Sequence, residues 1–319
     1  MVNNIKKKYD VIVIGELNVD LILNQIESLP EIGKEILASR MDLVLGSSSA
    51  IFASNLSSLG AKVSFLGKIG TDSFGDLVMD SLKNKGVNTD LIIRDEKLKT
   101  GATVVLNYGE ERANITHPGA MEHLTLSDIT VEKIQEGKHI HISSIFLQPE
   151  LQKNVYEIFK LAKEAELTTS LDVQWDPAEE WDVDLQKLLP YVDVFLPNKQ
   201  ELLCLTKENE LQDAVDKVSD SGNTIVIKMG NKGSICCSEG NQNKLPAYLN
   251  ENVVDAIGAG DSFNSGFIFK FIQGADLSEC QIFGNLIGAI NTTRAGGTAA
   301  FINYKQIIEI AKEKFGYSG

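Results

Sequence analysis

The sequence is constrained most by a repeated pattern in which short apolar runs alternate with longer helical stretches. Each run is rich in valine, isoleucine or leucine and alternates little with polar residues, as in parallel strands buried on both faces. The runs are Val11–Ile14, Val63–Leu66, His139–Ile142, Thr169–Val173, Val192–Leu196 and Thr224–Ile227. The helical stretches between them include Phe74–Lys85, Glu150–Glu166 and Asp213–Ser219. This alternation predicts an α/β fold with three layers, α/β/α, around a doubly wound, mostly parallel sheet.

Two regions break this pattern and predict a second, smaller sheet. Ser39–Leu45 alternates like a half-exposed strand, while Ala102–Leu106 and Ala113–Thr116 flank a hairpin with Gly109 in its turn. Because no crossover helices connect these segments, they cannot belong to the parallel sheet. We expect them to form a small antiparallel sheet that acts as a lid. The chain from Asp261 onward is predicted to be mostly helical.

The charge balance argues against several kinds of partner. The chain has 319 residues, with 44 acidic and 30 basic side chains and a formal net charge of −14. Nucleic acid and anionic membranes both require clustered lysine and arginine, so neither is expected as a partner. A phosphate ligand would have to be held by backbone amides and a metal ion rather than by a basic patch.

The sequence also predicts where the protein is located. No apolar run approaches the roughly 18–20 residues of a membrane span, and residues 1–10 do not resemble a signal peptide. The four cysteines, at positions 204, 236, 237 and 280, form no CxxC pair. We therefore expect a cytoplasmic protein with free thiols.

Polar and glycine residues follow four of the runs, at the points where the strands would end. They are Asn18 and Asp20, Gln174 and Asp176, Asn198 and Glu201, and Lys228 and Gly230. The carboxyl ends of parallel strands meet at one edge of a sheet, which is where ligands bind in open α/β folds. Each pair alone is more typical of a solvated turn, but together they predict a binding cleft.

The sharpest local feature is Gly258-Ala259-Gly260-Asp261 at the start of a predicted helix. Glycines let the backbone approach a ligand closely, and the free amides at a helix N-terminus favour an anion. This segment could therefore bind phosphate without lysine or arginine. Asp261 fits two roles, a helix N-cap or a general base beside the phosphate, and the residues alone leave both open. Its position at a helix N-terminus predicts a lowered carboxyl pKa.

Other catalytic motifs are absent from the sequence. There is no GxxxxGK[ST] sequence, no GxGxxG after the first strand, and no HRD or DFG sequence. The histidines at positions 117, 123, 139 and 141 lack HExxH spacing and are interpreted as packing or surface residues. These absences disfavour a Walker NTPase, a protein kinase and a dinucleotide-dependent oxidoreductase.

Three motifs, taken together, resemble the ribokinase/PfkB family of carbohydrate and nucleoside kinases over nearly the whole chain. The C-terminal signature of the family appears as Asp255–Asp261. Its N-terminal signature appears as Gly46–Ala50, followed by Leu59-Gly60 and Gly67–Gly75. An NxxE motif appears as Asn198–Glu201. The resemblance implies a ribokinase-like fold with residues 1–319 as one kinase domain.

The resemblance also implies a reaction, the transfer of the γ-phosphoryl group of ATP to a sugar hydroxyl, usually a primary alcohol. It implies Asp261 as the general base, with the amides of Gly258, Ala259 and Gly260 forming an anion hole. Asn198 and Glu201 would orient Mg²⁺ through its waters, since Mg²⁺ prefers oxygen ligands and retains several waters.

The substrate contacts that the resemblance implies lie on either side of this anion hole. Gly230 and Lys228 would approach ATP, and Asn285 would line the adenine pocket. Asp20, Asn18 and Gly46 would bind the sugar. The lid would come from about residues 16–45 and 100–118, and in some family members the lid forms a homodimer, so a dimer is left open here.

Some residues depart from the signatures of the family. Ala256 and Ile257 replace two threonines, but Asp255 is kept, so activation by a monovalent cation such as K⁺ is left open. Ile51 replaces an asparagine that contacts sugar in relatives, which suggests a more apolar pocket. Lys228 replaces a threonine and would either touch phosphate or point to solvent.

Substrate identity is predicted less sharply. Ser48 stands where several phosphosugar and ribose kinases carry lysine, which favours an unphosphorylated sugar such as ribose or fructose. Lys34, Arg94 and Arg112 could still bring positive charge to the site from the lid. A nucleoside is the alternative substrate, because Ile51 and Phe52 could face a base. A non-catalytic sugar-binding sensor of the same fold is a further alternative.

Overall fold

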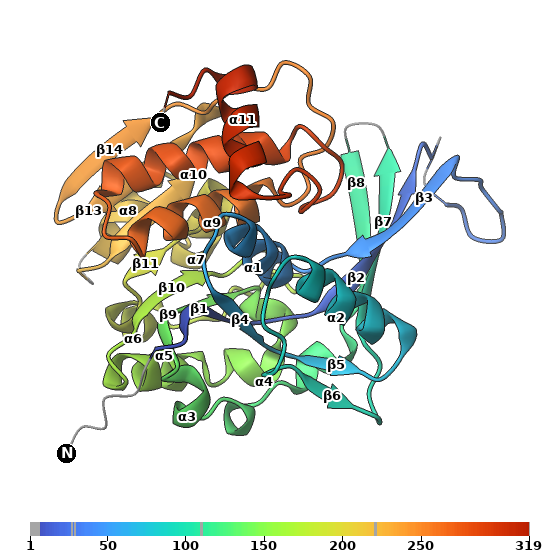
Figure 1. Ribbon diagram of the computed structural model, residues 1–319, viewed down its shortest axis with the longest axis horizontal. Coiled ribbons are helices and arrows are strands. Elements are labelled where there is room, and N and C mark those ends of the chain that lie inside the picture. Colours follow the sequence, from blue (N-terminus) through green and yellow to red (C-terminus); the bar gives the residue numbers. More distant parts are fainter. Residues whose placement is uncertain (1–6, 27, 29, 109–110, 220–221, 319) are drawn as a thin grey trace.

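The computed structural model describes residues 7–26, 28, 30–108, 111–219 and 222–318, and Gly109 of the predicted turn lies outside them. The main sheet has eight strands and includes all six predicted runs (Figure 1). In spatial order they are β14 (Asn241–Leu245), β13 (Ser234–Ser238), β12 (Thr224–Lys228), β11 (Val194–Phe195), β10 (Thr168–Asp172), β9 (Gly137–Ser143), β1 (Tyr9–Ile14) and β4 (Val63–Leu66). Every pairing from β4 to β12 is parallel, so the prediction of a mostly parallel sheet is confirmed.

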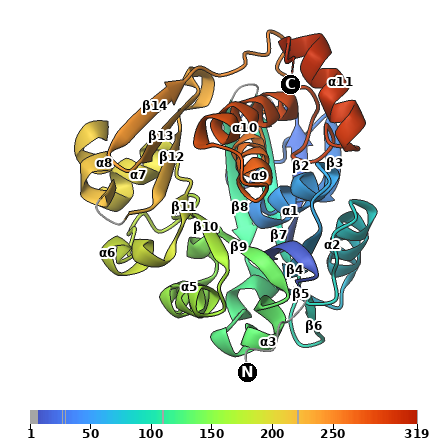
Figure 2. The ribbon, with the colours of Figure 1, turned by 60° about the vertical axis from the view of Figure 1, so that its left-hand side comes forward.

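Helices cover both faces of this sheet and give the predicted three layers (Figure 2). One face packs against α1 (Ser48–Ser58), α2 (Ser73–Asn84), α9 (Ala259–Phe271), α10 (Leu277–Asn291) and α11 (Tyr304–Phe315). The other packs against α3 (Val131–Ile134), α4 (Pro149–Gln152), α5 (Val155–Glu164), α6 (Leu185–Leu188), α7 (Lys199–Thr206) and α8 (Leu211–Ser219). Successive residues of β1 show why a continuous apolar run is needed. Val11 and Val13 lie in the first core, and Ile12 and Ile14 lie in the second.

A second sheet stands at one end of the molecule, at the right of Figure 1. Its order is β3 (Arg40–Leu45), β2 (Asn18–Asn24), β7 (Gly101–Tyr108) and β8 (Glu111–His117). The β2–β3 and β7–β8 pairs are antiparallel as expected, but the central β2–β7 pair is parallel. The reason is that β2 and β7 come from separate passes of the chain rather than from one hairpin. A further short parallel pair joins β5 (Lys68–Gly70) to β6 (Ile93–Asp95).

The structure also differs from the predicted elements at the edge of the main sheet and within residues 150–166. The antiparallel β13–β14 edge was not predicted, because β14 is mostly exposed and consists largely of asparagine, glutamine and lysine. The predicted helix over 150–166 is interrupted between α4 and α5, where the Asn154 side chain donates to the Glu150 carbonyl and competes with the helical hydrogen bonds. The four cysteines are free, as predicted. Within the described residues, no helix is both long and apolar enough to cross a membrane.

Candidate active site

A cleft of about 1160 Å³ opens at the carboxyl ends of the parallel strands. Residues from the second sheet, including Thr103 and Val105, line it together with residues of the main domain. Most of the predicted site residues meet there, namely Asn18, Asp20, Asn198, Glu201, Lys228, Gly230, Gly258, Ala259, Gly260 and Asp261. Gly46, Asp255 and Asn285 are not among the lining residues.

The 255–260 loop leads into α9 at the centre of the cleft. Gly258 is the N-cap residue of α9 and has a left-handed φ of 74°. A Cβ atom there would lie 2.8 Å from the Cα atom of Gly297, so both the backbone angle and the close approach require glycine. Gly258, Ala259 and Gly260 line the cleft and no side chain caps the start of α9, although the Ala259 amide donates to the Ala256 carbonyl at 3.2 Å. The geometry therefore suits an anion.

Asp261 lies in the first turn of α9 and is only 7% exposed. It is not the N-cap, since Gly258 takes that position. The expectation of a lowered pKa is also wrong. Burial, reinforced by the charge of Asp172, raises the pKa of Asp261 to about 6, although Lys228 and hydrogen bonds from Ser48 and Gln174 oppose the rise. A carboxylate with this pKa is ionised at neutral pH and is a better proton acceptor than an ordinary aspartate.

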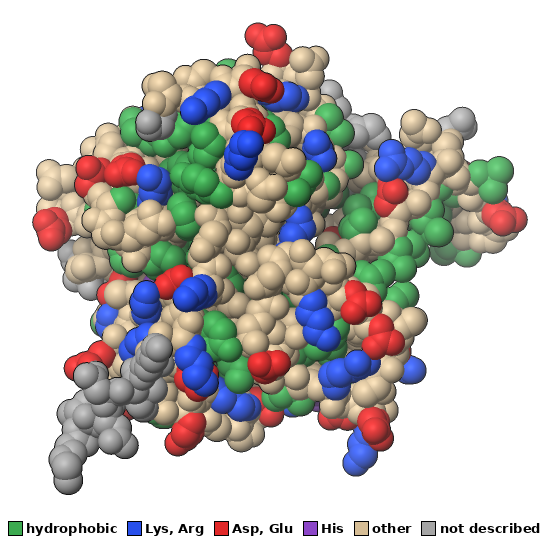
Figure 3. Space-filling model, in the orientation of Figure 1, with side chains coloured by type: hydrophobic (Ala, Val, Ile, Leu, Met, Phe, Trp, Pro, Cys, Tyr) green, Lys and Arg blue, Asp and Glu red, His purple; other side chains and the backbone are tan. Residues whose placement is uncertain are grey.

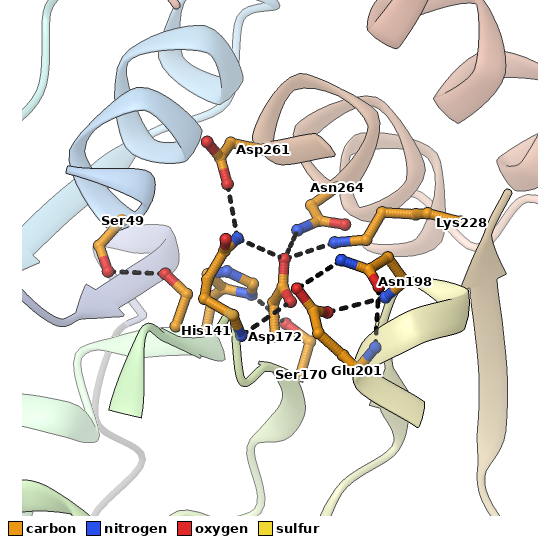
Figure 4. A network of polar contacts seen from close by, with 11 residues as sticks. Ser49, His141, Ser170, Asp172, Asn198, Glu201, Lys228, Asp261 and Asn264 are labelled. Carbon is orange, nitrogen blue, oxygen red and sulfur yellow. Dashed lines mark hydrogen bonds and ion pairs between the residues drawn. The ribbon is translucent and has the colours of Figure 1, made fainter. Parts of the chain in front are cut away.

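A buried cluster of polar side chains is connected to Asp261 by hydrogen bonds (Figure 4). The Gln174 amide donates to Asp261 Oδ1 at 2.9 Å and to Asp172 Oδ2 at 2.9 Å. Asp172 has no exposed surface and also accepts from Lys228 Nζ and Asn264 Nδ2, each at 2.5 Å. Gln174 has a left-handed φ of 61°, which is strained for a residue with a side chain and is typical of functional sites.

Lys228 does not point to solvent, because its side chain is only 11% exposed and is paired with Asp172. Burial disfavours the charged ammonium, but Asp172 and Glu201 more than compensate and raise the pKa of Lys228. A Cβ atom on Gly260 would lie 3.7 Å from Lys228 Nζ, so the ammonium stands beside the start of α9. This position provides a fixed positive charge next to the helix N-terminus.

Asn198 and Glu201 form a capping box at the start of α7. Glu201 accepts from the Asn198 backbone amide at 2.8 Å and from Asn198 Nδ2 at 2.6 Å. Burial, together with Asp172, raises the pKa of Glu201 to about 7. Both carboxylate oxygens are engaged within the capping box, so the pair fits a hydrated Mg²⁺ held through water better than a directly bound ion. Among the described residues, no cluster of three or more His, Cys, Asp or Glu side chains could hold a metal.

The predicted sugar residues lie at the start of β2, a strand of the second sheet, and beside it at the end of β3. Asn18 Nδ2 donates to Asp20 Oδ1 and to Thr103 Oγ1, both at 3.0 Å. A Cβ atom on Gly46 would collide with the Asp20 carboxylate, so glycine at this position leaves room for that side chain. Gly46 therefore contributes by leaving space for the Asp20 side chain and does not itself line the cleft.

Several other predicted contacts lie away from the cleft. Asn285 is 7% exposed within α10. Phe52 is buried and stacks on His141 at 3.7 Å, so the expectation that it could face a base is wrong. Burial lowers the pKa of His139 to about 3 and also lowers that of His141, and both hydrogen bond to Ser170, consistent with packing roles.

Two of the predicted lid cations, Lys34 and Arg94, do not line the cleft either. Lys34 pairs with Glu31 on the surface, and Arg94 pairs with Asp76. The side chain of Arg112 lies outside the described residues. Ile51 lines the cleft but packs closely on Gly258 and Gly297, so it supports the 255–260 loop as well as reducing the polarity of the pocket.

Glu16 is a cleft residue that the sequence interpretation missed. It lies two residues after the end of β1 and is 1% exposed. Its carboxyl group accepts from the Ser49 amide and hydroxyl at the start of α1. Burial raises the pKa of Glu16 to about 7, and the nearby charge of Asp261 adds to this. The rule that polar residues at strand ends face the ligand could have identified it.

The sequence profile of the pfkB family of carbohydrate kinases matches residues 8–303, so this chain belongs to that family. A sugar kinase of Archaeoglobus fulgidus, described as uncharacterized, is 30% identical over 240 residues, which cover 73% of this chain and 92% of the relative. The chain is therefore a phosphotransferase with an alcohol group as acceptor.

Solved structures show the same fold. Arabidopsis thaliana ribokinase complexed with ribose and ATP superposes with a TM-score of 0.82 at 24% identity, covering 95% of this chain and 99% of that protein. A putative ribokinase II of E. coli in complex with ATP and Mg²⁺ gives a TM-score of 0.82 at 22% identity, covering 95% and 99%. The predicted ribokinase-like fold is confirmed.

Gln174 is expected to control the ionisation of Asp261. Gln174→Leu removes the amide that stabilises the carboxylate, so the pKa of Asp261 should rise further and the acidic limb of kcat/KM should move up by about one pH unit. Gln281→Leu is the matched control. It removes a buried glutamine of α10 that bonds to Ser234 in β13, and it should leave the acidic limb of the kcat/KM profile unchanged. Identical pH profiles for the wild type and Gln174→Leu would show that Gln174 does not influence the pKa of Asp261.

Lys228 and Asp172 are expected to be coupled in stability. Lys228→Met leaves the buried carboxylate without its cation and should lower the free energy of unfolding by about 3 kcal/mol or more. Adding Asp172→Leu removes the stranded charge, so the double variant should lose much less than the sum of the two single variants. Urea unfolding measures all three variants, and additive losses would contradict the coupling.

Proposed function

We propose that this protein is an ATP-dependent sugar kinase that transfers the γ-phosphoryl group to a hydroxyl group, usually primary, of a free sugar such as ribose or fructose. The observation that carries the proposal is the placement of Asp261. A buried carboxylate with a pKa of about 6 stands in the first turn of a helix whose N-terminus carries no side-chain cap and lines the same cleft. This arrangement offers a proton acceptor beside an anion site.

In the proposed reaction, Asp261 accepts the proton of the sugar hydroxyl as the hydroxyl oxygen attacks the γ-phosphorus of ATP, while the bond from that phosphorus to the β–γ bridging oxygen breaks and ADP leaves. The amides of Gly258 and Gly260 and the ammonium of Lys228 stabilise the charge on the transferred group, and the Ala259 amide, which donates to the Ala256 carbonyl, would have to turn from it to take part. Phosphoryl transfer has a loose transition state that mainly requires positioning and charge stabilisation. Gly230 would approach the ATP phosphates, Asn285 would support the adenine side from within α10, and Mg²⁺ would reach Asn198 and Glu201 through water.

The charge of the cleft supports a neutral acceptor. Its acidic lining residues are Glu16, Asp20, Glu122, Asp176, Glu201 and Asp261, whereas Lys228 is the single cation among the described lining residues. Because the acidic lining residues outnumber this one cation, which is already paired with Asp172, a sugar phosphate would meet net negative charge at the acceptor side. Asn18, Asp20 and Thr103 offer hydrogen-bond partners for neutral hydroxyl groups instead.

A nucleoside is the second candidate acceptor, and one aromatic side chain favours it. Trp175 lines the cleft and is 46% exposed, and its edge-to-face contact with Trp181, at 5.0 Å, fixes its orientation. A half-exposed indole can stack on a flat base, but it can equally stack on the apolar face of a sugar ring. An acceptor screen separates the two candidates.

The screen measures ADP release over pentoses, hexoses, sugar acids, sugar phosphates and nucleosides with Mg²⁺ present. Asp261→Asn should lower turnover of the accepted substrate by about 100-fold or more while ATP still binds, since that is the scale of general-base catalysis. Asp276→Asn, which alters another aspartate at a helix N-terminus, is the control and should keep wild-type turnover. Wild-type turnover in Asp261→Asn would overturn the assignment of the base. Ligand-induced thermal shifts without ADP release would favour a non-catalytic sensor.

We also propose that the second sheet is a lid over the sugar and that two copies of the chain pair through it in the cytoplasm. Large apolar side chains gather on this sheet and its β2–β3 connection (Figure 3). The exposed ones are Ile32, Ile36, Leu37, Met41, Leu43 and Ile115. Exposed apolar patches of this kind mark protein interaction sites.

Leu37→Glu combined with Ile115→Glu should convert the dimer into a monomer, because each change places a charge in the proposed interface. Light scattering coupled to size-exclusion chromatography measures the mass directly. Val131→Glu introduces the same charge at an exposed apolar residue in α3 and should leave the mass unchanged. A monomeric wild type would contradict pairing through the lid.

A further inference from the structure

The 255–260 loop is held in shape by side chains from other elements rather than by its own. Its residues after Asp255 are Ala256, Ile257, Gly258, Ala259 and Gly260, so it contains no side-chain hydroxyl that could bond across the turn. Three fully buried polar residues surround it, namely Asn55 in α1, Ser262 in α9 and Asn291 in α10. Each comes from a different helix.

These residues form a directional chain of hydrogen bonds. Asn55 Nδ2 donates to Ser262 Oγ at 3.0 Å and to the carbonyl of Gly297 at 2.9 Å. Ser262 Oγ donates to Asn291 Oδ1 at 3.0 Å. Asn291 Nδ2 then donates to the carbonyl of Ile257 at 2.6 Å. The chain therefore fixes the loop carbonyl one residue before the N-cap of α9.

At the start of the loop, the Asp255 carboxylate binds two backbone amides. Its Oδ1 atom accepts from the Ile257 amide at 2.9 Å, and its Oδ2 atom accepts from the Gly296 amide at 2.9 Å. The carbonyls of Ala256 and Gly258 accept from the amides of Ala259 and Ser262. Every one of these oxygens is thus faced by an N–H group.

This arrangement does not fit a bound monovalent cation at the loop. Such an ion would need several oxygen ligands, and the loop could supply them only from Asp255 and its carbonyls. Each of these oxygens already accepts from one N–H group, whose partial positive charge would repel a cation bound at a remaining lone pair. The Asn291 amide in particular donates to the Ile257 carbonyl at 2.6 Å, so an ion would have to share that oxygen with a donor of like charge.

We propose that Asn55 and Asn291, acting through Ser262, are positioning residues that hold the 255–260 loop ready for the phosphates of ATP, so that nucleotide binding and phosphoryl transfer do not require K⁺. The inference rests on the proposed function, because it takes ATP as the ligand of this loop. It concerns how the loop is held rather than which sugar is phosphorylated.

The test measures binding of a non-hydrolysable Mg·ATP analogue by calorimetry, in K⁺ and in tetramethylammonium, and needs no acceptor sugar. For the wild type, the two dissociation constants should agree within about twofold, since a cation without a site shifts no equilibrium. A wild-type affinity more than about fivefold higher in K⁺ would overturn the proposal. Absence of nucleotide binding in both salts would instead overturn the proposed function, and this inference with it.

Asn291→Asp tests the role of the Asn291 amide directly, because nucleotide binding by this variant should depend on K⁺. It keeps an oxygen for Ser262 but replaces the N–H donor to Ile257 with a second oxygen, which creates a site for a cation. Binding should weaken by about tenfold in tetramethylammonium and recover in K⁺. Asn223→Asp, at a buried asparagine before β12, is the control and should show no effect of K⁺.

A second substitution keeps the proposal testable if Asn291→Asp does not fold. Asn55→Ala removes the donors to Gly297 and Ser262 without adding an oxygen, so binding should weaken in both salts and K⁺ should not restore it. Wild-type affinity in folded Asn55→Ala, or no response to K⁺ in folded Asn291→Asp, would show that these side chains do not position the loop.

Discussion

The site depends on the burial of three carboxyl groups, Asp172, Glu201 and Asp261, around the single ammonium of Lys228. One cation cannot neutralise three anions, so burial and mutual repulsion raise the pKa of both Glu201 and Asp261. Asp172, which has no exposed surface, is the direct partner of Lys228. The imbalance leaves Asp261 with the basicity that a proton acceptor needs, and it explains why a helix N-terminus does not make this aspartate a weak base.

A second constraint is the meeting of two helix N-termini in one cleft. The start of α9 has no side-chain cap because its first residues are alanine and glycine, whereas serines at the start of α1 bond to Glu16 and Asp261. Ile51 of α1 packs against Gly258 and Gly297 and so supports the 255–260 loop. Under the proposed function, this apolar contact supports the phosphate side of the cleft and leaves acceptor recognition to the residues of the second sheet and the strand ends.

The sequence predicted the parallel sheet and most of the cleft because both follow from local patterns. Apolar runs such as Val11–Ile14 identify buried strands, and strand-end residues such as Asn198 and Lys228 must converge at one edge of the sheet. The β13–β14 edge and the parallel β2–β7 pair depend on contacts between distant segments and leave no such pattern. For the same reason, the bond from Asn291 to Ile257, the stack of Phe52 on His141 and the pKa of Asp261 could not be read from the sequence.

The most direct test of the central claim is a crystal structure with the accepted sugar and a non-hydrolysable Mg·ATP analogue bound together. If Asp261 is the general base, one of its carboxylate oxygens will lie about 2.6–3.2 Å from a single sugar hydroxyl that points at the γ-phosphorus. The terminal phosphate will lie against the amides of Gly258–Gly260. A sugar hydroxyl facing the phosphate but out of hydrogen-bond reach of Asp261, with no bridging water, would contradict the account.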